Sequence, residues 1–171
     1  MMSGLKKQKY DTNVLFLGLG GNIGDVQKTI ELAEKEISYQ LGNITKKSSI
    51  YKSKAWGNKN QPDFLNKVIV VETALNVEDC LKACLNIEQK LGRIRTHEKW
   101  IARTIDIDLL FYNDSIINKN ELKIPHPLLH LRAFVLLPLV EISPKFIHPV
   151  LNLTTALLLE SCTDSIEIQK V

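Results

Sequence analysis

The sequence predicts an α+β domain in which helices pack on a mainly antiparallel sheet. Apolar residues alternate between a two-residue period and a helical period, and the resulting elements follow the order strand, helix, strand, strand, helix, strand. The 171 residues are enough for one buried core. We expect the domain to span residues 12–162, between a flexible leader (1–11) and a polar C-terminal tail (163–171).

The first strand is expected over residues 13–19, and it runs into a glycine-rich turn and then a helix from residue 25. This arrangement invites a dinucleotide-binding interpretation. However, Ile23 stands where the GxGxxG pattern needs glycine, and the chain has no GxxxxGK[ST] loop. Asn22 is therefore either a helix cap or a ligand contact.

Two further strands are expected over residues 44–52 and 64–73, joined by a loop long enough to bind a ligand. Phe64 and Asn66 share one face where the second of these strands begins. The ring and the amide could stack on and read a flat heterocycle. Core packing with an amide at a strand end explains them equally well.

A second helix is expected after Asn76, and its apolar stripe contains Val77, Leu81, Cys84, Leu85 and Leu91. Glu88 falls near the middle of that stripe. A carboxylate there needs a partner, and Arg93 or Arg95 is near enough in sequence. A structural ion pair and a functional role both remain open for it.

The fourth strand, residues 104–112, contains two carboxylates on one face. Asp106 and Asp108 lie about 7 Å apart along an extended strand. The opposite, apolar face is expected to contain Ile105, Ile107, Leu109 and Phe111. Neighbouring carboxylates favour a cation such as Mg²⁺, and the preceding loop, rich in arginine and lysine, suits polyphosphate.

The remaining elements are a short hairpin over residues 116–124 and helices over 131–142 and 153–160. His126 lies between two prolines, which makes it the best ligand-contact candidate among the histidines. Its spacing to His130 resembles a zinc site, but no Glu or third ligand accompanies the pair.

Composition excludes several classes of protein. A net charge of +3 is too small to indicate nucleic acid or membrane as a partner, and no run approaches the ~20 apolar residues of a membrane span. The leader lacks the apolar core of a signal peptide. The three cysteines form no CxxC pair, so we expect reduced thiols and a cytoplasmic location.

The order of elements matches a ferredoxin-like layout, with helices on one face of the sheet and the aspartate face open. Six motifs in order then suggest a family. They are Gly18-x-Gly20-Gly21-Asn22, Gln61-Pro62-Asp63-Phe64-Leu65-Asn66, Glu88 with Gly92-Arg93-x-Arg95, Trp100, Arg103-Thr104-Ile105-Asp106-Ile107-Asp108 and Pro125-His126-Pro127. Over residues 13–160 this combination closely resembles the 6-hydroxymethyl-7,8-dihydropterin pyrophosphokinases of folate biosynthesis.

The resemblance implies transfer of pyrophosphate from ATP to the pterin hydroxymethyl group, leaving AMP. It implies that Asp106 and Asp108 hold two Mg²⁺ ions and act in catalysis with Arg93 and Arg103, and that Asp106 assists deprotonation of the pterin hydroxyl. The ATP-binding residues that it implies are Glu88, Arg95, Trp100, Leu109, His126 and Arg132. The pterin-binding residues that it implies are Asn22, Ser53, Trp56, Phe64, Asn66, Trp100 and Phe134. A monomer is expected, with ATP and the reduced pterin as its partners.

The chain departs from the family pattern in two loops. Ile101-Ala102 replaces a usual Gly-Pro, Ser53-Lys54-Ala55 stands where Thr with a nearby Pro is usual, and Gly21 replaces a common serine. Two rival functions remain: another Mg²⁺-dependent phosphoryl or nucleotidyl transferase, and a non-catalytic ferredoxin-like binding module. The stacking-aromatic strand of an RNA-binding module does not occur in the sequence.

Overall fold

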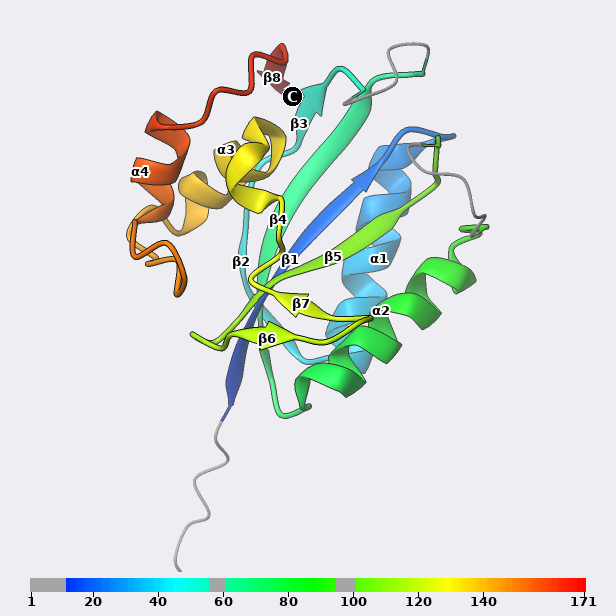
Figure 1. Ribbon diagram of the computed structural model, residues 1–171. Coiled ribbons are helices and arrows are strands. Elements are labelled where there is room, and N and C mark those ends of the chain that lie inside the picture. The colour runs from blue at the N-terminus through cyan, green and yellow to red at the C-terminus, as the bar shows by residue number, and fades with distance from the viewer. Residues whose placement is uncertain (1–11, 56–60, 95–100) are drawn as a thin grey trace, which may run out of the picture.

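The computed structural model describes residues 12–55, 61–94 and 101–171 (Figure 1). Its main sheet has the strand order β5-β1-β4-β3-β8, and β2 also pairs with β4. The strands of this sheet are β1 (Asn13–Gly21), β2 (Asn43–Lys47), β3 (Tyr51–Ser53), β4 (Phe64–Thr73), β5 (Asp106–Tyr112) and β8 (Ile168–Lys170). Every pairing is antiparallel, which confirms the predicted fold class.

The helices cover both faces of this sheet. They are α1 (Val26–Gln40), α2 (Val77–Lys90), α3 (Ala133–Ile142) and α4 (Thr155–Glu160), with a 3₁₀ turn, η1 (Leu129–Leu131), before α3. Figure 1 shows α1 and α2 on one side of the sheet and α3 and α4 on the other. The expectation of helices on one face therefore holds for α1 and α2 only.

The larger core lies between the sheet and α1 with α2. Five apolar residues at helical spacing along α1 and its C-cap are buried there: Val26, Ile30, Ala33, Ile37 and Leu41. The side chain of Asp25, not that of Asn22, caps α1 by accepting the N–H of Lys28.

The buried face of α2 differs in part from the predicted stripe. Asn76 caps the helix, and Glu88 is buried, both as expected. The prediction that Leu85 is a core residue is wrong, since 37% of its surface is exposed. Leu85 faces a surface hollow beside β5, and Cys80 and Ile87 fill the core instead.

An irregularity in β5 moves one aromatic residue to the other face of the sheet. Phe16 and Leu17 of β1 pair with Phe111 and Leu109, so that Leu110 is an extra residue in β5. Phe111 therefore joins the second core, beneath α3 and α4, and the prediction that it shares a face with Leu109 is wrong.

The remaining elements are short. The predicted hairpin is present as β6 (Ile117–Asn118) and β7 (Lys123–Ile124). The strand expected over residues 44–52 is split into β2 and β3, and between them the Ser48 hydroxyl accepts the N–H of Val68. The segment expected to be a tail contributes β8, which pairs with β3. In the described part of the chain, no helix has the length and apolar character that a bilayer crossing requires.

Candidate functional site

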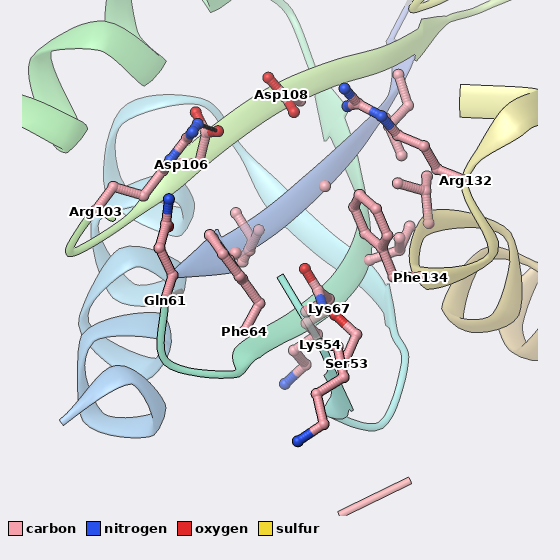
Figure 2. Close-up of a pocket in the computed structure, with 17 residues that line it drawn as sticks. Ser53, Lys54, Gln61, Phe64, Lys67, Arg103, Asp106, Asp108, Arg132 and Phe134 are labelled. Carbon is pink, nitrogen blue, oxygen red and sulfur yellow. Dashed lines mark hydrogen bonds and ion pairs between the residues drawn. The ribbon is translucent and has the colours of Figure 1, made fainter. Parts of the chain in front are cut away.

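A pocket opens on the α3 side of the sheet, over β1, β4 and β5. Its floor includes Gly18 and Gly20 of β1, whose lack of side chains leaves the space free. Figure 2 shows Phe64 from the start of β4 and Phe134 from the start of α3 on opposite sides of this pocket. A flat ring can enter between two such aromatic side chains.

A buried polar pair lies at one wall of this pocket. The side-chain amide of Asn66 donates to the hydroxyl of Ser53 at 2.9 Å, and both residues are buried. A Cβ atom added at Gly20 would lie 3.1 Å from the Asn66 amide oxygen, so this glycine allows the amide to pack closely. The pair offers hydrogen-bonding groups to the edge of a heterocycle.

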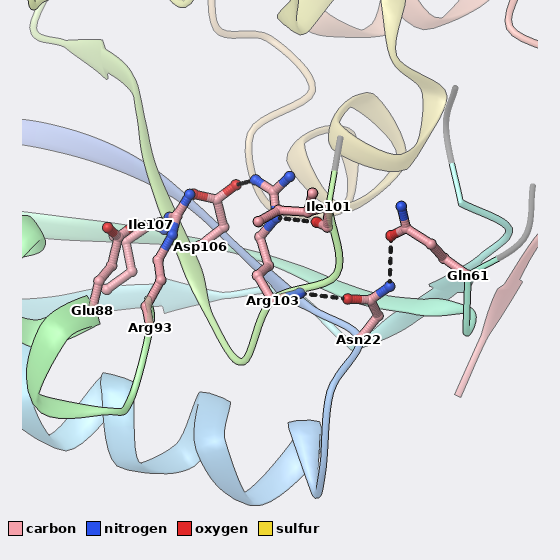
Figure 3. A network of polar contacts seen from close by, with 8 residues as sticks. All are labelled: Asn22, Gln61, Glu88, Arg93, Ile101, Arg103, Asp106 and Ile107. Atoms are coloured by element: carbon pink, nitrogen blue, oxygen red, sulfur yellow. Dashed lines mark hydrogen bonds and ion pairs between the residues drawn. The ribbon is translucent and has the colours of Figure 1, made fainter. Parts of the chain in front are cut away.

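The two predicted carboxylates line the same pocket from β5. Asp106 and Asp108 share one face of the strand, as the alternation predicted. Arg93 pairs with one carboxylate oxygen of Asp106, and Arg103 pairs with the other. Figure 3 shows both arginines converging on Asp106.

Glu88 fixes this cluster to the core. Its carboxylate is buried, pairs with Arg93, and accepts the backbone N–H of Ile107 at 2.7 Å. Ile107 lies between the two aspartates in the strand. The partner that the sequence demanded for Glu88 is thus Arg93, and the carboxylate has a structural contact to β5 as well.

The two aspartates differ in their electrostatic environment. Burial favours protonation of Asp106, but Arg103 and Arg93 outweigh this effect and hold its pKa below its usual range. For Asp108, burial and then the charge of Asp106 raise the pKa to about 7, although Arg132 opposes the change. A further cation beside Asp108 would therefore favour its ionised form.

These residues fit a divalent cation of the magnesium type. Two carboxylates on one strand face supply the hard oxygen ligands that Mg²⁺ prefers. Among residues 12–55, 61–94 and 101–171, no cluster of three or more acidic, histidine or cysteine side chains is arranged to hold a metal. Such a site would leave coordination positions for water and for a ligand's phosphates.

A second, larger hollow opens on the other side of the aspartates. Its volume is about 710 Å³, against about 110 Å³ for the pocket between the two phenylalanines. Glu88, Arg93, Leu109 and His126, four residues that the resemblance implied, line it. Burial, and then the charge of Arg132, lower the pKa of His126 to about 4, so this imidazole is neutral at pH 7.

The two cavities meet at four residues. Arg103, Asp106, Asp108 and Arg132 line both of them. Arg132 also lies over the ring of Phe134, with 5.7 Å between the guanidinium carbon and the ring centroid. A group passed from a ligand in one cavity to a ligand in the other would cross this junction of two acids and two arginines.

Asn22 lines neither cavity, and it connects three loops (Figure 3). Its amide oxygen accepts the N–H of Arg103 at 2.8 Å, while its amide nitrogen donates to the Gln61 side chain and to the Pro62 carbonyl, each at 3.2 Å. Its role in pterin binding remains a prediction, and these contacts join the segment before β5 to the segment before β4.

Three of the predicted contacts fall in the segments that the structure does not describe. Trp56, Arg95 and Trp100 lie outside the described residues. Conversely, Gln61 and Lys54 line the first pocket although the sequence assigned them no role. The place of Gln61 just before β4, in one of the six motifs, was the signal that could have identified it.

The family model for 7,8-dihydro-6-hydroxymethylpterin-pyrophosphokinase matches residues 16–144. A 2-amino-4-hydroxy-6-hydroxymethyldihydropteridine pyrophosphokinase from Aquifex aeolicus is 42% identical over 140 residues, which cover 80% of this chain and 84% of that protein. A Synechocystis protein of the same name is also 42% identical, over 150 residues covering 86% of this chain and 76% of that protein.

Among solved structures, wild-type HPPK–DHPS from Plasmodium falciparum is similar with a TM-score of 0.70 and 20% identity. The match covers 88% of this chain and 44% of the Plasmodium chain, so this chain spans less than half the length of that protein. This likeness supports the fold, and the sequence relatives support the family.

Proposed function

Since the chain belongs to the 7,8-dihydro-6-hydroxymethylpterin-pyrophosphokinase family, we propose that it transfers pyrophosphate from ATP to 6-hydroxymethyl-7,8-dihydropterin at the place where the two cavities meet. Members of this family are ATP-dependent diphosphotransferases of folate biosynthesis. The observation that carries this proposal is the set of four residues shared by both cavities: Arg103, Asp106, Asp108 and Arg132. In-line transfer requires the donor and the acceptor to approach one charged centre from opposite sides.

The pterin occupies the pocket between Phe64 and Phe134. The ring stacks on these side chains, and Asn66 with Ser53 reads its polar edge. The hydroxymethyl group then points toward the aspartates on β5. The small volume and the buried amide suit a flat heterocycle better than a triphosphate.

ATP occupies the larger hollow, with its phosphates toward Arg93, Arg103 and Arg132. Guanidinium groups form charge-assisted hydrogen bonds to phosphate oxygens, and they keep their charge at any physiological pH. The neutral His126 imidazole provides one donor and one acceptor in this hollow. Its Nδ1 accepts the N–H of Leu128, so Nε2 carries the proton and can donate.

Asp106 and Asp108 would hold the expected two Mg²⁺ ions. Bound there, divalent cations would supply positive charge that offsets the charge developing on the phosphates during transfer. Asp106 keeps Arg93 and Arg103 oriented toward the phosphates through its two ion pairs. Because those arginines lower its pKa, Asp106 is a weak base, and its part in deprotonating the pterin hydroxyl remains a prediction.

We further propose that the enzyme acts as a cytoplasmic monomer. The three cysteines, Cys80, Cys84 and Cys162, are all free thiols, which supports a reducing compartment. Sedimentation or light scattering would test the oligomeric state.

Product identification tests the proposed reaction. The purified protein is incubated with ATP, Mg²⁺ and 6-hydroxymethyl-7,8-dihydropterin, and the nucleotides and pterins are separated and identified. AMP and the pterin diphosphate in equal amounts are expected. Release of ADP or of free pyrophosphate would instead indicate another kind of phosphoryl or nucleotidyl transferase.

A further inference from the structure

Helix α3 begins at the pocket, and the residue at its N-cap position does not cap it with a side-chain hydrogen bond. Its first turn carries Phe134, and Arg132 directly precedes it. Arg132 occupies the N-cap position and makes no capping hydrogen bond through its side chain. The first backbone N–H groups of a helix need acceptors from elsewhere, because no intrahelical carbonyl reaches them.

Asp164 supplies such an acceptor from a distant part of the chain. One carboxylate oxygen accepts the N–H of Ala133 at 2.9 Å, and the other accepts the N–H of Ile166 at 3.2 Å. A carboxylate at this end of a helix is also favoured by the helix dipole. Asp164 therefore acts as the cap of α3, 31 residues beyond the amide that it binds.

The segment that carries Asp164 is attached to the opposite wall of the pocket. The N–H of Lys54 donates to the Glu167 carbonyl, and Ile168 of β8 pairs with Ser53 of β3. Ser53 is the residue that holds the Asn66 amide. Residues 162–168 alternate between half-buried and exposed positions, as expected for an extended segment lying on a surface.

A second connection joins the same parts. Lys170 of β8 pairs with Glu141 near the end of α3 at 3.0 Å. Glu141 also accepts hydrogen bonds from the hydroxyl of Ser49, just before β3, and from that of Tyr51, in β3. The C-terminal segment is thus bonded to both ends of α3 and to β3.

We propose that Asp164 is a positioning residue for the pterin pocket: by capping α3 from a segment fixed to β3, it sets the place of Phe134 relative to Ser53 and Asn66. This inference rests on the proposed function, because it assumes that the pocket holds the pterin. Ser53 pairs with Phe64 in the sheet, so β3 also positions the aromatic ring facing Phe134. When α3 shifts, the fraction of molecules with a closed ring-binding pocket falls, and apparent affinity falls by that fraction.

The test compares Asp164→Ala and Asp164→Asn with a matched control, Asn76→Ala. Asn76 caps α2 through a hydrogen bond from the N–H of Asp79, and it lines neither cavity. The dissociation constant for 6-hydroxymethyl-7,8-dihydropterin is measured by equilibrium dialysis, together with its KM, kcat and the melting temperature of each variant.

Asp164→Ala is expected to weaken pterin binding by up to about fivefold, since loss of a typical helix cap, about 1 kcal/mol, changes the equilibrium between closed and open pockets by that factor. Asp164→Asn keeps an acceptor oxygen and is expected to bind nearly as the wild type does. Asn76→Ala is expected to lower the melting temperature by a similar amount without changing pterin affinity. If Asp164→Ala fails to fold, Asp164→Ser provides a milder loss of the contact under the same comparison.

The inference would be overturned if Asp164→Ala and the wild type bound pterin equally well at a temperature well below both melting temperatures. A loss of affinity in Asn76→Ala as large as that in Asp164→Ala would also overturn it. The proposed function is judged separately. Pterin binding without AMP formation in the wild type would contradict the function, whereas turnover with unchanged affinity in every variant would contradict only the positioning role.

Discussion

Replacing Glu88 with alanine tests whether this buried acid supports the site or contacts the nucleotide directly. The residue is 1% exposed, and its carboxylate accepts the N–H of Ile107 at 2.7 Å and pairs with Arg93. Removing one partner of a buried ion pair costs about 3–5 kcal/mol. Because Arg93 keeps Asp106 as a second partner, we expect the lower end, about 3 kcal/mol.

Glu88→Gln is the matched variant. Its amide oxygen can still accept the N–H of Ile107 but no longer carries the charge that faces Arg93. We expect it to lose less than half as much stability as Glu88→Ala. Urea unfolding curves give both differences in free energy, and ATP titrations of the initial rate give KM and kcat.

Both variants should lower kcat more than they raise the KM for ATP, because the defect lies in the orientation of Arg93 and of β5. Two results together would refute this reasoning. Glu88→Ala would lose less than about 1 kcal/mol of unfolding free energy, a typical change for a single substitution, and its KM for ATP would rise more than tenfold. They would make Glu88 a nucleotide contact.

Four further outcomes are expected. Asp108→Ala should remove nearly all Mg²⁺-dependent turnover while circular dichroism stays unchanged, and near-normal turnover would contradict the metal assignment. Arg103→Ala should slow the chemical step in single-turnover experiments more than it weakens ATP binding, because the arginine matters most as charge develops. Gly21→Ser should lower kcat and the melting temperature together, since an added Cβ would lie 2.4 Å from the Thr104 carbonyl oxygen. For Glu141, burial raises the pKa, but hydrogen bonds from Ser49, Lys170 and Tyr51 lower it from 4.5 to about 2. The ionised carboxylate therefore contributes to stability above about pH 4.5, and this contribution is lost as the pH falls toward 2. The unfolding free energy of Glu141→Gln in urea should differ from that of the wild type at pH 6 and converge with it at pH 2.

Strong periodic patterns predicted the central elements well. The bounds of β4 are those expected, and Glu88 is buried where a 100° rotation per residue placed it. Such patterns work because each reflects burial on one face of a regular element. The face on which Phe111 lies was predicted wrongly, because one extra residue in β5 reverses the alternation and no residue type there indicates a bulge.

The contacts that organise the site could not be predicted from local patterns. Asn22 bonds to residues 39, 40 and 81 positions away, and Asp164 caps a helix 31 positions earlier. Polar side chains of this kind carry no periodic signal. β8 was missed for a related reason: its three residues are stabilised by pairing with β3 and not by burial of an apolar face.

The short strand β8 also affects how the protein behaves in concentrated solution. An uncovered strand edge is a template for pairing with another chain, and natural proteins limit this hazard with short, charged outer strands. β8 spans three residues, two of them exposed, and contains Lys170, while it covers the backbone of β3. A shortened protein lacking β8 is therefore expected to self-associate through β3, and an affinity tag is better fused to the N-terminus than after Val171.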